Sequence, residues 1–281
     1  MKKTILDFKA MKKKGEKITY LTAYDFLIAQ LCEKAGFDML LVGDIAGMVV
    51  HGYSGTVPMT MDQMIQHAED VRRGAPNTFI IGDMPFLSYQ LSVENAIANA
   101  GRFYKEAGVD AIKLEGGLRV VDKVRGIVDA GMNVMGHIGL TPQSSGQVGG
   151  FKAQGRTADT ALEVIEDAVA IEKAGAFALL VEAVPPEVGK IITETLSIPV
   201  LGIGAGMHTD GQVLIVGDLL GLFEAFTPKF VKKYANLSEV IEKAFGEYID
   251  DVQTSKFPEE KHCYRMVEGE LDKLEGRLKD K

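Results

Sequence analysis

Short apolar runs alternate with longer amphipathic segments along most of this chain. Eight of the runs are rich in Val, Ile, Leu and Met and have the length of β-strands. They are ITYLTAY (18–24), MLLVGD (39–44), FIIGDMP (79–85), AIKLEGG (111–117), NVMGHIG (133–139), ALLVEAV (178–184), PVLGIGAG (199–206) and QVLIVGD (212–218). Because each run is followed by a helix-like or loop segment, the pattern indicates a parallel sheet.

The segments between the runs have helical periodicity, and several of them stop in the same way. We place helices at residues 25–36, 61–75, 92–108, 120–131 and 160–175. The sequence Ala-Gly directly before a strand recurs at Gly36, Gly108, Gly131 and Gly175. Gly readily adopts the left-handed conformation that ends a helix. Eight serial βα units most simply close into a (β/α)8 TIM barrel, and an open doubly wound sheet is the alternative.

The two ends of the chain read as helices outside this repeat. The segment MKKTILDFKAMKKKGEK starts basic but lacks the apolar core of a signal peptide, so it predicts an amphipathic helix. The apolar stretch near 236–250 and the charged EGELDKLEGRLKDK predict further helices. We therefore expect a single barrel domain over residues 1–281, with residues 219–281 as a C-terminal helical extension.

Several of the eight apolar runs carry a carboxylate at or near their end. The site candidates among these acids are Asp44, Asp83, Glu115 and Glu182, and a further run carries His137. Catalytic residues of a barrel lie at the carboxyl ends of its strands, so all five should share one mouth. Acids are costly to bury unless they bind a metal, pair with a cation or take up protons. The pattern therefore predicts a site.

Carboxylate oxygens suit Mg²⁺, which usually takes only one or two protein carboxylates and keeps positions for water and substrate. We expect Asp44 and Asp83 to bind the metal, with Glu115 as a third or water-mediated ligand. Lys113 leaves its strand on the same face as Glu115 and is suited to holding an anionic substrate. The alternative is a structural network of ion pairs inside the barrel.

Glu182 differs from the other acids because the run before it, ALLV, is apolar and Ala183-Val184-Pro185 follows it. Apolar surroundings make a carboxylate a stronger base, which suits removal of a proton from carbon. A salt-bridged acid at a strand end is the alternative. His137 is suited to orienting a substrate oxygen, although a lone His is equally often structural. The Gly-rich GIGAG (202–206) lacks the spacing of a dinucleotide fingerprint and predicts a rim loop or a packing turn.

Composition narrows the class of protein. The chain has 281 residues, 46% hydrophobic and 25% charged, as is ordinary for a protein with a large core. The net charge of −8 argues against nucleic acid as a partner. The two cysteines, Cys32 and Cys263, have no metal or redox spacing, which suits a reducing compartment. No run approaches the roughly 18 apolar residues of a membrane span, so we expect a cytoplasmic protein without membrane partners.

Eight motifs in order along the chain resemble one enzyme family. They are VGDxxGM (42–48), TVPMT (56–60), VRRGAP (71–76), KLEGG (113–117), GHIGLTPQS (136–144), FKAQGR (151–156), VEAVP (181–185) and GIGAGxxTDGQVL (202–214). Together they resemble the ketopantoate hydroxymethyltransferase family of the phosphoenolpyruvate mutase and isocitrate lyase superfamily. The resemblance runs from about residue 5 to residue 258, nearly the whole chain.

The resemblance implies a (β/α)8 barrel that assembles into a homo-oligomer, commonly a decamer. It implies transfer of a hydroxymethyl group from 5,10-methylenetetrahydrofolate to 3-methyl-2-oxobutanoate, giving 2-dehydropantoate for pantothenate biosynthesis. Mg²⁺ would lie near Asp44, Asp83 and Glu115, with Glu182 as the base. Lys113 and His137 would contact the keto acid, as would Asp44 and Asp83.

The chain departs from the family pattern at a few positions. Ile45 stands where the family usually has a Ser that helps to bind the keto-acid carboxylate, and Met207-His208 replaces a small polar residue. Phe151 for Tyr is a milder change. Two alternatives stay open: a Mg²⁺-dependent aldolase or lyase acting on another 2-oxo acid, and a catalytically weak or silent paralogue. The intact set of acids favours the transferase over the silent paralogue.

Overall fold

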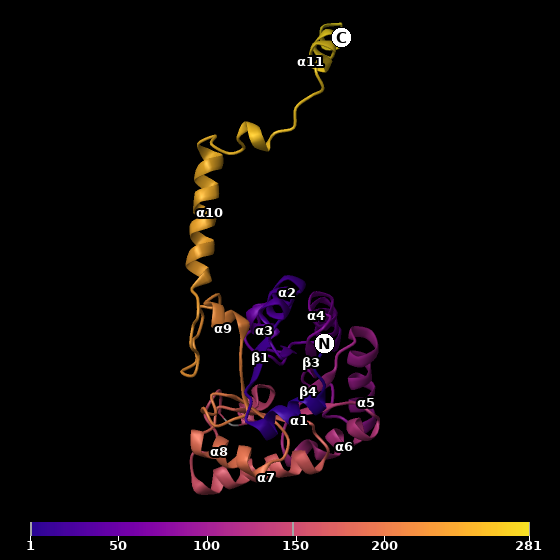
Figure 1. Ribbon diagram of the computed structural model, residues 1–281, viewed down its shortest axis with the longest axis vertical. Helices are drawn as coiled ribbons and strands as arrows, with labels where there is room; N and C mark the ends of the chain where they lie inside the picture. The colour runs from indigo at the N-terminus through magenta and orange to yellow at the C-terminus, as the bar shows by residue number, and fades with distance from the viewer. Residues whose placement is uncertain (1, 148, 281) are drawn as a thin grey trace. The chain divides into compact units, whose positions relative to one another are not determined.

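The computed structural model, drawn in Figure 1, describes residues 2–147 and 149–280. Its strands close into an eight-stranded, all-parallel barrel in sequence order. The strands are β1 (Ile18–Thr22), β2 (Met39–Val42), β3 (Phe79–Asp83), β4 (Ala111–Glu115), β5 (Val134–Gly139), β6 (Ala178–Glu182), β7 (Val200–Ile203) and β8 (Gly211–Leu214). Every predicted strand is therefore present. The (β/α)8 barrel is confirmed, and the open sheet is wrong because β8 pairs with β1.

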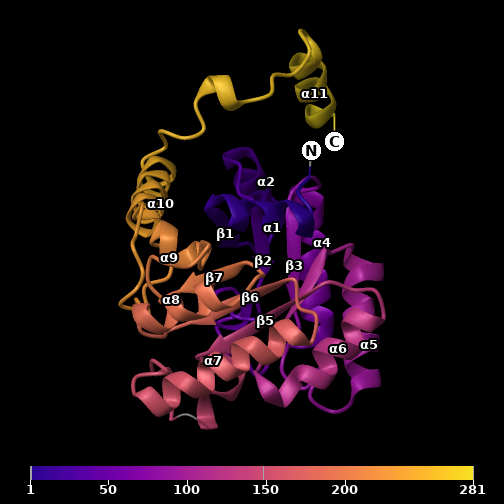
Figure 2. The same cartoon turned by 60° about the horizontal axis from the view of Figure 1, so that its bottom comes forward.

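A helix follows each strand except β7, after which residues 204–210 lead to β8 without a helix, and α1 precedes β1. The helices are α1 (Ile5–Lys14), α2 (Phe26–Ala35), α3 (Ala46–Val49), α4 (Met61–Gly74), α5 (Val93–Arg102), α6 (Val121–Asp129), α7 (Ala158–Lys173), α8 (Pro186–Thr195) and α9 (Val216–Leu220). A π-helical turn, η1 (Phe103–Ala107), extends α5, and two 3₁₀ turns, η2 (Leu118–Val120) and η3 (Pro142–Gln147), follow β4 and β5. Figure 2 shows α6 and α7 on the outer side of the barrel, where both contact β5.

The recurrent glycines end their helices as the sequence predicts. Gly36 follows α2 with φ +87° and Gly108 follows η1 with φ +63°, both in the left-handed region. The amide of Gly36 donates to the carbonyl of Cys32, one of the carbonyls that would otherwise have no hydrogen-bond partner at the end of the helix. The next strand starts within a few residues, so each glycine sets the direction in which the chain returns to the barrel.

The core has two layers, as a barrel requires. The inner layer fills the barrel with side chains such as Tyr20, Met39 and Ile81, and Phe8 of α1 packs edge-on against Phe79, with ring centroids 5.1 Å apart. The outer layer lies between strands and helices and holds most of the buried Val, Ile, Leu and Ala residues. Each fully buried aliphatic side chain contributes about 1.5–3 kcal/mol relative to an exposed one, so these layers hold the rim rigidly.

The chain divides into two compact units, the first ending at Tyr234 and the second beginning at Ala235. The first unit contains the barrel and α9, where the predicted C-terminal extension begins. The second contains α10 (Leu237–Gln253), the 3₁₀ turn η4 (Glu260–His262) and α11 (Glu270–Lys279), and none of these three elements has a buried residue. Both cysteines are free. No helix in the described residues is long and apolar enough to cross a membrane.

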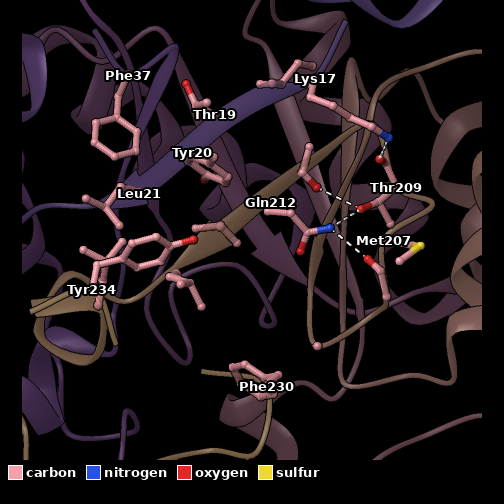
Figure 3. Close-up of a pocket in the computed structure, with 17 residues that line it drawn as sticks. Lys17, Thr19, Tyr20, Leu21, Phe37, Met207, Thr209, Gln212, Phe230 and Tyr234 are labelled. Carbon is pink, nitrogen blue, oxygen red and sulfur yellow. Dashed lines mark hydrogen bonds between the residues drawn. The ribbon is translucent and has the colours of Figure 1, made fainter. Parts of the chain in front are cut away.

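One side of the barrel is less well covered than the others. Every residue of β2, β3, β4 and β7 is buried, whereas the paired residues Thr19 of β1 and Gln212 of β8 are exposed. The helix after β8, α9, has only five residues. We refer to the paired strands β1 and β8 as the β1–β8 seam. A cavity of about 870 Å³ lies along this seam, with Phe37, Phe230 and Tyr234 in its lining (Figure 3).

Candidate active site

The structure places the predicted site residues together at the carboxyl ends of the strands. Asp83, Glu115 and Glu182 are the last residues of β3, β4 and β6, and Asp44 lies two residues beyond β2. His137 lies inside β5, directly paired with Glu115 of β4. Their common location follows from the parallel barrel, because all strands point their carboxyl ends to one mouth. Their catalytic roles stay predictions.

Nearly all these groups are withdrawn from water. The exposed fraction is 3% for Asp44, 1% for Asp83, 5% for Glu115, 2% for Lys113 and 2% for His137. Charged groups are rarely buried so deeply unless each has a partner. The contacts among them therefore decide what the cluster can do.

Lys113 joins the acids of β3 and β4. Its Nζ lies 2.7 Å from Oδ1 of Asp83, the residue paired with it across the two strands. The same Nζ lies 3.3 Å from Nδ1 of His137. The second oxygen of Asp83, Oδ2, accepts from the main-chain amide of Asp44 at 3.1 Å. Asp83 thus fixes the start of the loop that carries Asp44.

His137 lies between two carboxylates. Its Nδ1 is 3.5 Å from Oε1 of Glu115, and its Nε2 is 3.2 Å from Oε2 of Glu182, though not aligned as a hydrogen bond. The side chain of Glu182 is 15% exposed, so it is the most accessible acid of the group. A base that must meet a substrate needs this partial exposure, and His137 fixes its direction.

Two supporting residues do not stand out in the sequence. Gln143, in the turn after β5, donates from Nε2 to Oδ2 of Asp44 at 2.9 Å, while its amide donates to Oε2 of Glu115 at 3.0 Å. The hydroxyl of Tyr89 lies 2.8 Å from Oε1 of Gln143 and 3.1 Å from the amide of Glu115. In the sequence, Gln143 is marked only by its place in GHIGLTPQS, and nothing marks Tyr89. Both residues act from loops that fold over the mouth, and a local pattern of apolar residues does not predict such contacts.

The acids of the cluster differ in how readily they ionise. Burial raises the pKa of Asp44 well above its usual range, and the charges of Asp83 and Glu115 add to this effect. Burial also raises the pKa of Asp83, although the ammonium of Lys113 opposes it. Burial acts to raise the pKa of Glu115 too, but its contacts with His137 and the charge of Lys113 outweigh burial and lower the pKa.

The two bases of the cluster hold their protons. Burial acts to lower the pKa of Lys113, but the carboxylates of Asp83, Glu115 and Asp44 outweigh it and raise the pKa. Burial and the neighbouring Lys113 act to lower the pKa of His137, yet the contacts with Glu115 and Glu182 raise it to about 9. The carboxylates around Lys113 and His137 therefore favour the cationic forms of both side chains.

The cluster has more acids than cations. Its carboxylates are Asp44, Asp83, Glu115 and Glu182, and its cations are Lys113 and His137. A divalent cation would balance this excess and relieve the repulsion that raises the pKa of Asp44. In residues 2–147 and 149–280, no group of three or more His, Cys, Asp or Glu side chains is arranged to hold a metal ion by itself. The residues thus fit Mg²⁺ with water and substrate in its shell better than a closed protein cage.

Ile45 lies at the start of α3, directly after Asp44. Its side chain is partly buried and packs against the outer core layer, so it brings no hydrogen-bonding group to the mouth. Its main-chain amide has no partner in the part of the chain that the structure describes. An open amide beside a cluster of buried charges can donate to an anion.

The cavity along the β1–β8 seam is separate from this cluster. Gln212 donates from Nε2 to Thr209 Oγ1 and to the carbonyl of Gly206, both at 2.8 Å, and Lys17 reaches the carbonyl of Thr209 (Figure 3). None of the acids of the mouth lines this cavity. Gly204 and Gly206 of GIGAG border it, so that motif forms a turn at the seam.

Solved structures share the architecture of this chain. Phosphonopyruvate hydrolase, solved as a complex with oxalate and Mg²⁺, matches 99% of this chain and 96% of its own, with a TM-score of 0.60 and 15% identity. A 2,3-dimethylmalate lyase of the PEP mutase/isocitrate lyase superfamily matches 100% of this chain and 97% of its own, with a TM-score of 0.59 and 18% identity. These similarities show the fold, a (β/α)8 barrel.

Closer relatives identify the family. The family model of ketopantoate hydroxymethyltransferase matches residues 2–260. The 3-methyl-2-oxobutanoate hydroxymethyltransferase of Alkaliphilus metalliredigens is 59% identical over 275 residues, 97% of both chains. That of Clostridium beijerinckii is 49% identical over 274 residues, 98% of this chain and 100% of its own. The chain belongs to the ketopantoate hydroxymethyltransferase family and is a hydroxymethyltransferase enzyme.

Proposed function

We propose that this enzyme transfers a hydroxymethyl group from 5,10-methylenetetrahydrofolate to 3-methyl-2-oxobutanoate, giving 2-dehydropantoate with the help of Mg²⁺. The observation that supports this most is the buried mouth, where acids outnumber cations and Glu182 alone is partly exposed. The names of relatives that share up to 59% of their residues with this chain support the same reaction.

Mg²⁺ would be held by Asp44 and Asp83, with Glu115 in direct or water-mediated contact. When bound, it would polarise the keto group of the substrate and so acidify the adjacent carbon. Lys113 keeps Asp83 in place and supplies positive charge near the anionic substrate. Gln143 holds Asp44 and Glu115 at a fixed separation by donating to both.

Glu182 would remove the proton from C3 of the oxo acid. His137 contacts Glu182 with Nε2 and, being cationic, would orient the carboxylate and a substrate oxygen. The enolate left by proton removal would form a carbon–carbon bond to the methylene carbon of the folate as one carbon–nitrogen bond breaks. Water would then displace the second nitrogen and supply the hydroxyl oxygen. The two folate nitrogens would take up the proton held by Glu182 and the remaining proton of that water, so that tetrahydrofolate leaves. The buried surroundings exclude bulk water from the charged groups until the second substrate is in place.

The folate would bind with its ring system near Glu182. A cavity of about 250 Å³ opens at the rim, bordered by Gly116 after Glu115 and by Gly139, which pairs with Glu182. Thr141, Gln154 and Asp167 give the cavity polar walls. A flat heterocycle with several donors and acceptors suits such a lining.

We also propose that the enzyme works in the cytoplasm as a homo-oligomer, with a decamer as the expected assembly. The support is α10, whose apolar side chains include Phe245, Tyr248 and Ile249, exposed by 64%, 60% and 53%. A helix with such a face is normally covered in the working protein. No nucleic acid is expected to bind, given the net charge of −8.

Product analysis tests the reaction. The protein is incubated with Mg²⁺, 3-methyl-2-oxobutanoate and methylenetetrahydrofolate, and 2-dehydropantoate is measured by mass spectrometry. We expect product only when all three are present. Turnover of a 2-oxo acid without the folate would instead indicate an aldolase or lyase, and no turnover on a panel of 2-oxo acids would indicate a silent paralogue.

A further inference from the structure

Tyr24 brings a hydroxyl group to the mouth that the proposed reaction has not yet used. β1 ends at Thr22, but the amide of Ala23 still donates to the carbonyl of Leu41 at 2.9 Å. The chain therefore stays beside β2 beyond the strand, which brings Tyr24 level with the segment that carries Asp44. His67 of α4 holds the position, since its Nδ1 donates to the carbonyl of Tyr24 at 2.7 Å.

The hydroxyl of Tyr24 is buried without a partner. Tyr24 is 4% exposed, and within the described residues its oxygen makes no hydrogen bond. The nearby Thr22 already accepts from the amide of Val216 at 2.9 Å. A buried hydroxyl without a partner lowers stability, so proteins rarely leave one unless a ligand or water completes it.

The surroundings of Tyr24 are acidic. Burial raises the pKa of its hydroxyl, and Thr22 acts to lower that pKa. The negative charges of Asp218, Asp44 and Asp83 raise the pKa further. The group is therefore a neutral donor at the pH of the cell. Asp218 is itself 6% exposed and lies in α9, directly after β8. Because the charges of Asp44 and Asp83 act on the Tyr24 hydroxyl, the hydroxyl lies within electrostatic reach of the predicted metal ligands.

We propose that the Tyr24 hydroxyl donates a hydrogen bond to the carboxylate of the 2-oxo acid, together with the open main-chain amide of Ile45. The inference rests on the proposed function. The two donors come from the ends of neighbouring strands, β1 and β2, and a carboxylate can accept from both. Ile45 lacks a hydroxyl, so Tyr24 supplies the side-chain donor on this side of the mouth.

Tyr24→Phe removes only the hydroxyl. We expect KM for 3-methyl-2-oxobutanoate to rise at least about tenfold, because a hydrogen bond to a charged group is lost. The kcat should stay within about threefold and KM for the folate should not change, since the bond is made in ground and transition states alike. Calorimetry with the oxo acid and Mg²⁺, without folate, should show the same loss of affinity.

Tyr104→Phe is the matched control. Tyr104 lies at the opposite end of the barrel, where its hydroxyl donates to the carbonyl of Asp110 and accepts from the amide of Asn133, the residues before β4 and β5. This variant should lower the melting temperature without changing either KM. Ile45→Ser should also rescue Tyr24→Phe, with a larger gain than Ile45→Ser gives in the wild type.

Each outcome decides one of the two proposals. If the wild type makes no product but binds the oxo acid, and Tyr24→Phe weakens that binding, the reaction is wrong and the role of Tyr24 holds. If the wild type is active but Tyr24→Phe leaves KM and affinity unchanged, or changes kcat alone, the role of Tyr24 is overturned. If the wild type does not bind the oxo acid, both proposals fail.

Discussion

The mouth of the barrel and the β1–β8 seam are built on the same strands but differ in what they bury. The mouth buries acids and cations in direct contact, such as Asp83 and Lys113, beside a cavity of about 250 Å³. The seam has a cavity of about 870 Å³, with Phe37, Phe230 and Tyr234 in its lining. The size of a cavity is therefore a poor guide to chemistry in this molecule, and the burial of charge is the better one.

The difference has a physical cause. Burying acids at the mouth costs free energy, so we expect that a ligand or a metal binds to them. The seam does not carry this cost. It is open because α9 has only five residues and the side chains of Thr19 and Gln212 are exposed to solvent. The comparison predicts that substitutions at the mouth change turnover far more than stability, whereas exposed apolar surface outside the mouth governs assembly.

The largest effects should come from the metal ligands. Asp44→Ala should weaken Mg²⁺ binding and nearly abolish turnover while the fold stays intact, because it relieves repulsion among buried acids. Asp83→Ala should have the same effects on Mg²⁺ and turnover but should also lower the melting temperature, because the buried Lys113 loses its partner. Calorimetry with Mg²⁺, steady-state kinetics and circular dichroism measure the three quantities. Normal Mg²⁺ binding and activity in either variant would remove that residue from the metal site.

The next effect concerns the base. Glu182→Gln keeps the shape of the side chain and removes its basicity, so exchange of the C3 proton of the oxo acid with deuterated water should fall by at least about 10²-fold. Binding of Mg²⁺ and substrate should change little, since Glu182 lies at the exposed side of the cluster. NMR follows the exchange directly, and exchange at the wild-type rate would place the base elsewhere.

The sequence predicts the acids of the mouth well because their signal is local. A strand-like run that ends in a carboxylate identifies Asp83, Glu115 and Glu182 before any contact is known. The left-handed glycines likewise predict where helices stop. In these places one short stretch of chain carries both the structure and the chemistry.

Residues that act across loops could not be predicted in this way. Gln143 reaches Asp44 over a separation of 99 residues, and Tyr24 stands out only once its hydroxyl is seen to lack a partner. The last predicted strand, 212–218, ends early because α9 begins at Val216, whose amide donates to Thr22 of β1. Such tertiary contacts override what a short apolar run predicts.

A moderate effect is expected at Ile45. A Ser hydroxyl could donate to the substrate carboxylate, and a hydrogen bond to a charged group contributes roughly 1.5–3 kcal/mol. Ile45→Ser should therefore raise kcat/KM for 3-methyl-2-oxobutanoate by about tenfold or more. Steady-state kinetics with methylenetetrahydrofolate compare the two proteins. An unchanged or lower value would mean that Ile45 suits a different oxo acid, and a panel of 2-oxo acids would identify it.

The smallest effect on turnover should come from α10, which lies in the second unit. Light scattering at micromolar concentration should give the wild type a mass larger than that of a dimer, because the apolar side chains of α10 need cover. Phe245→Ser with Tyr248→Ser should reduce that mass while turnover per chain changes by less than about twofold, because neither residue belongs to the cluster at the mouth. Glu242→Ser, on the same helix, is the control and should preserve the assembly. A monomeric wild type would rule out the oligomer, and a large loss of turnover in the double variant would mean that the mouth depends on assembly.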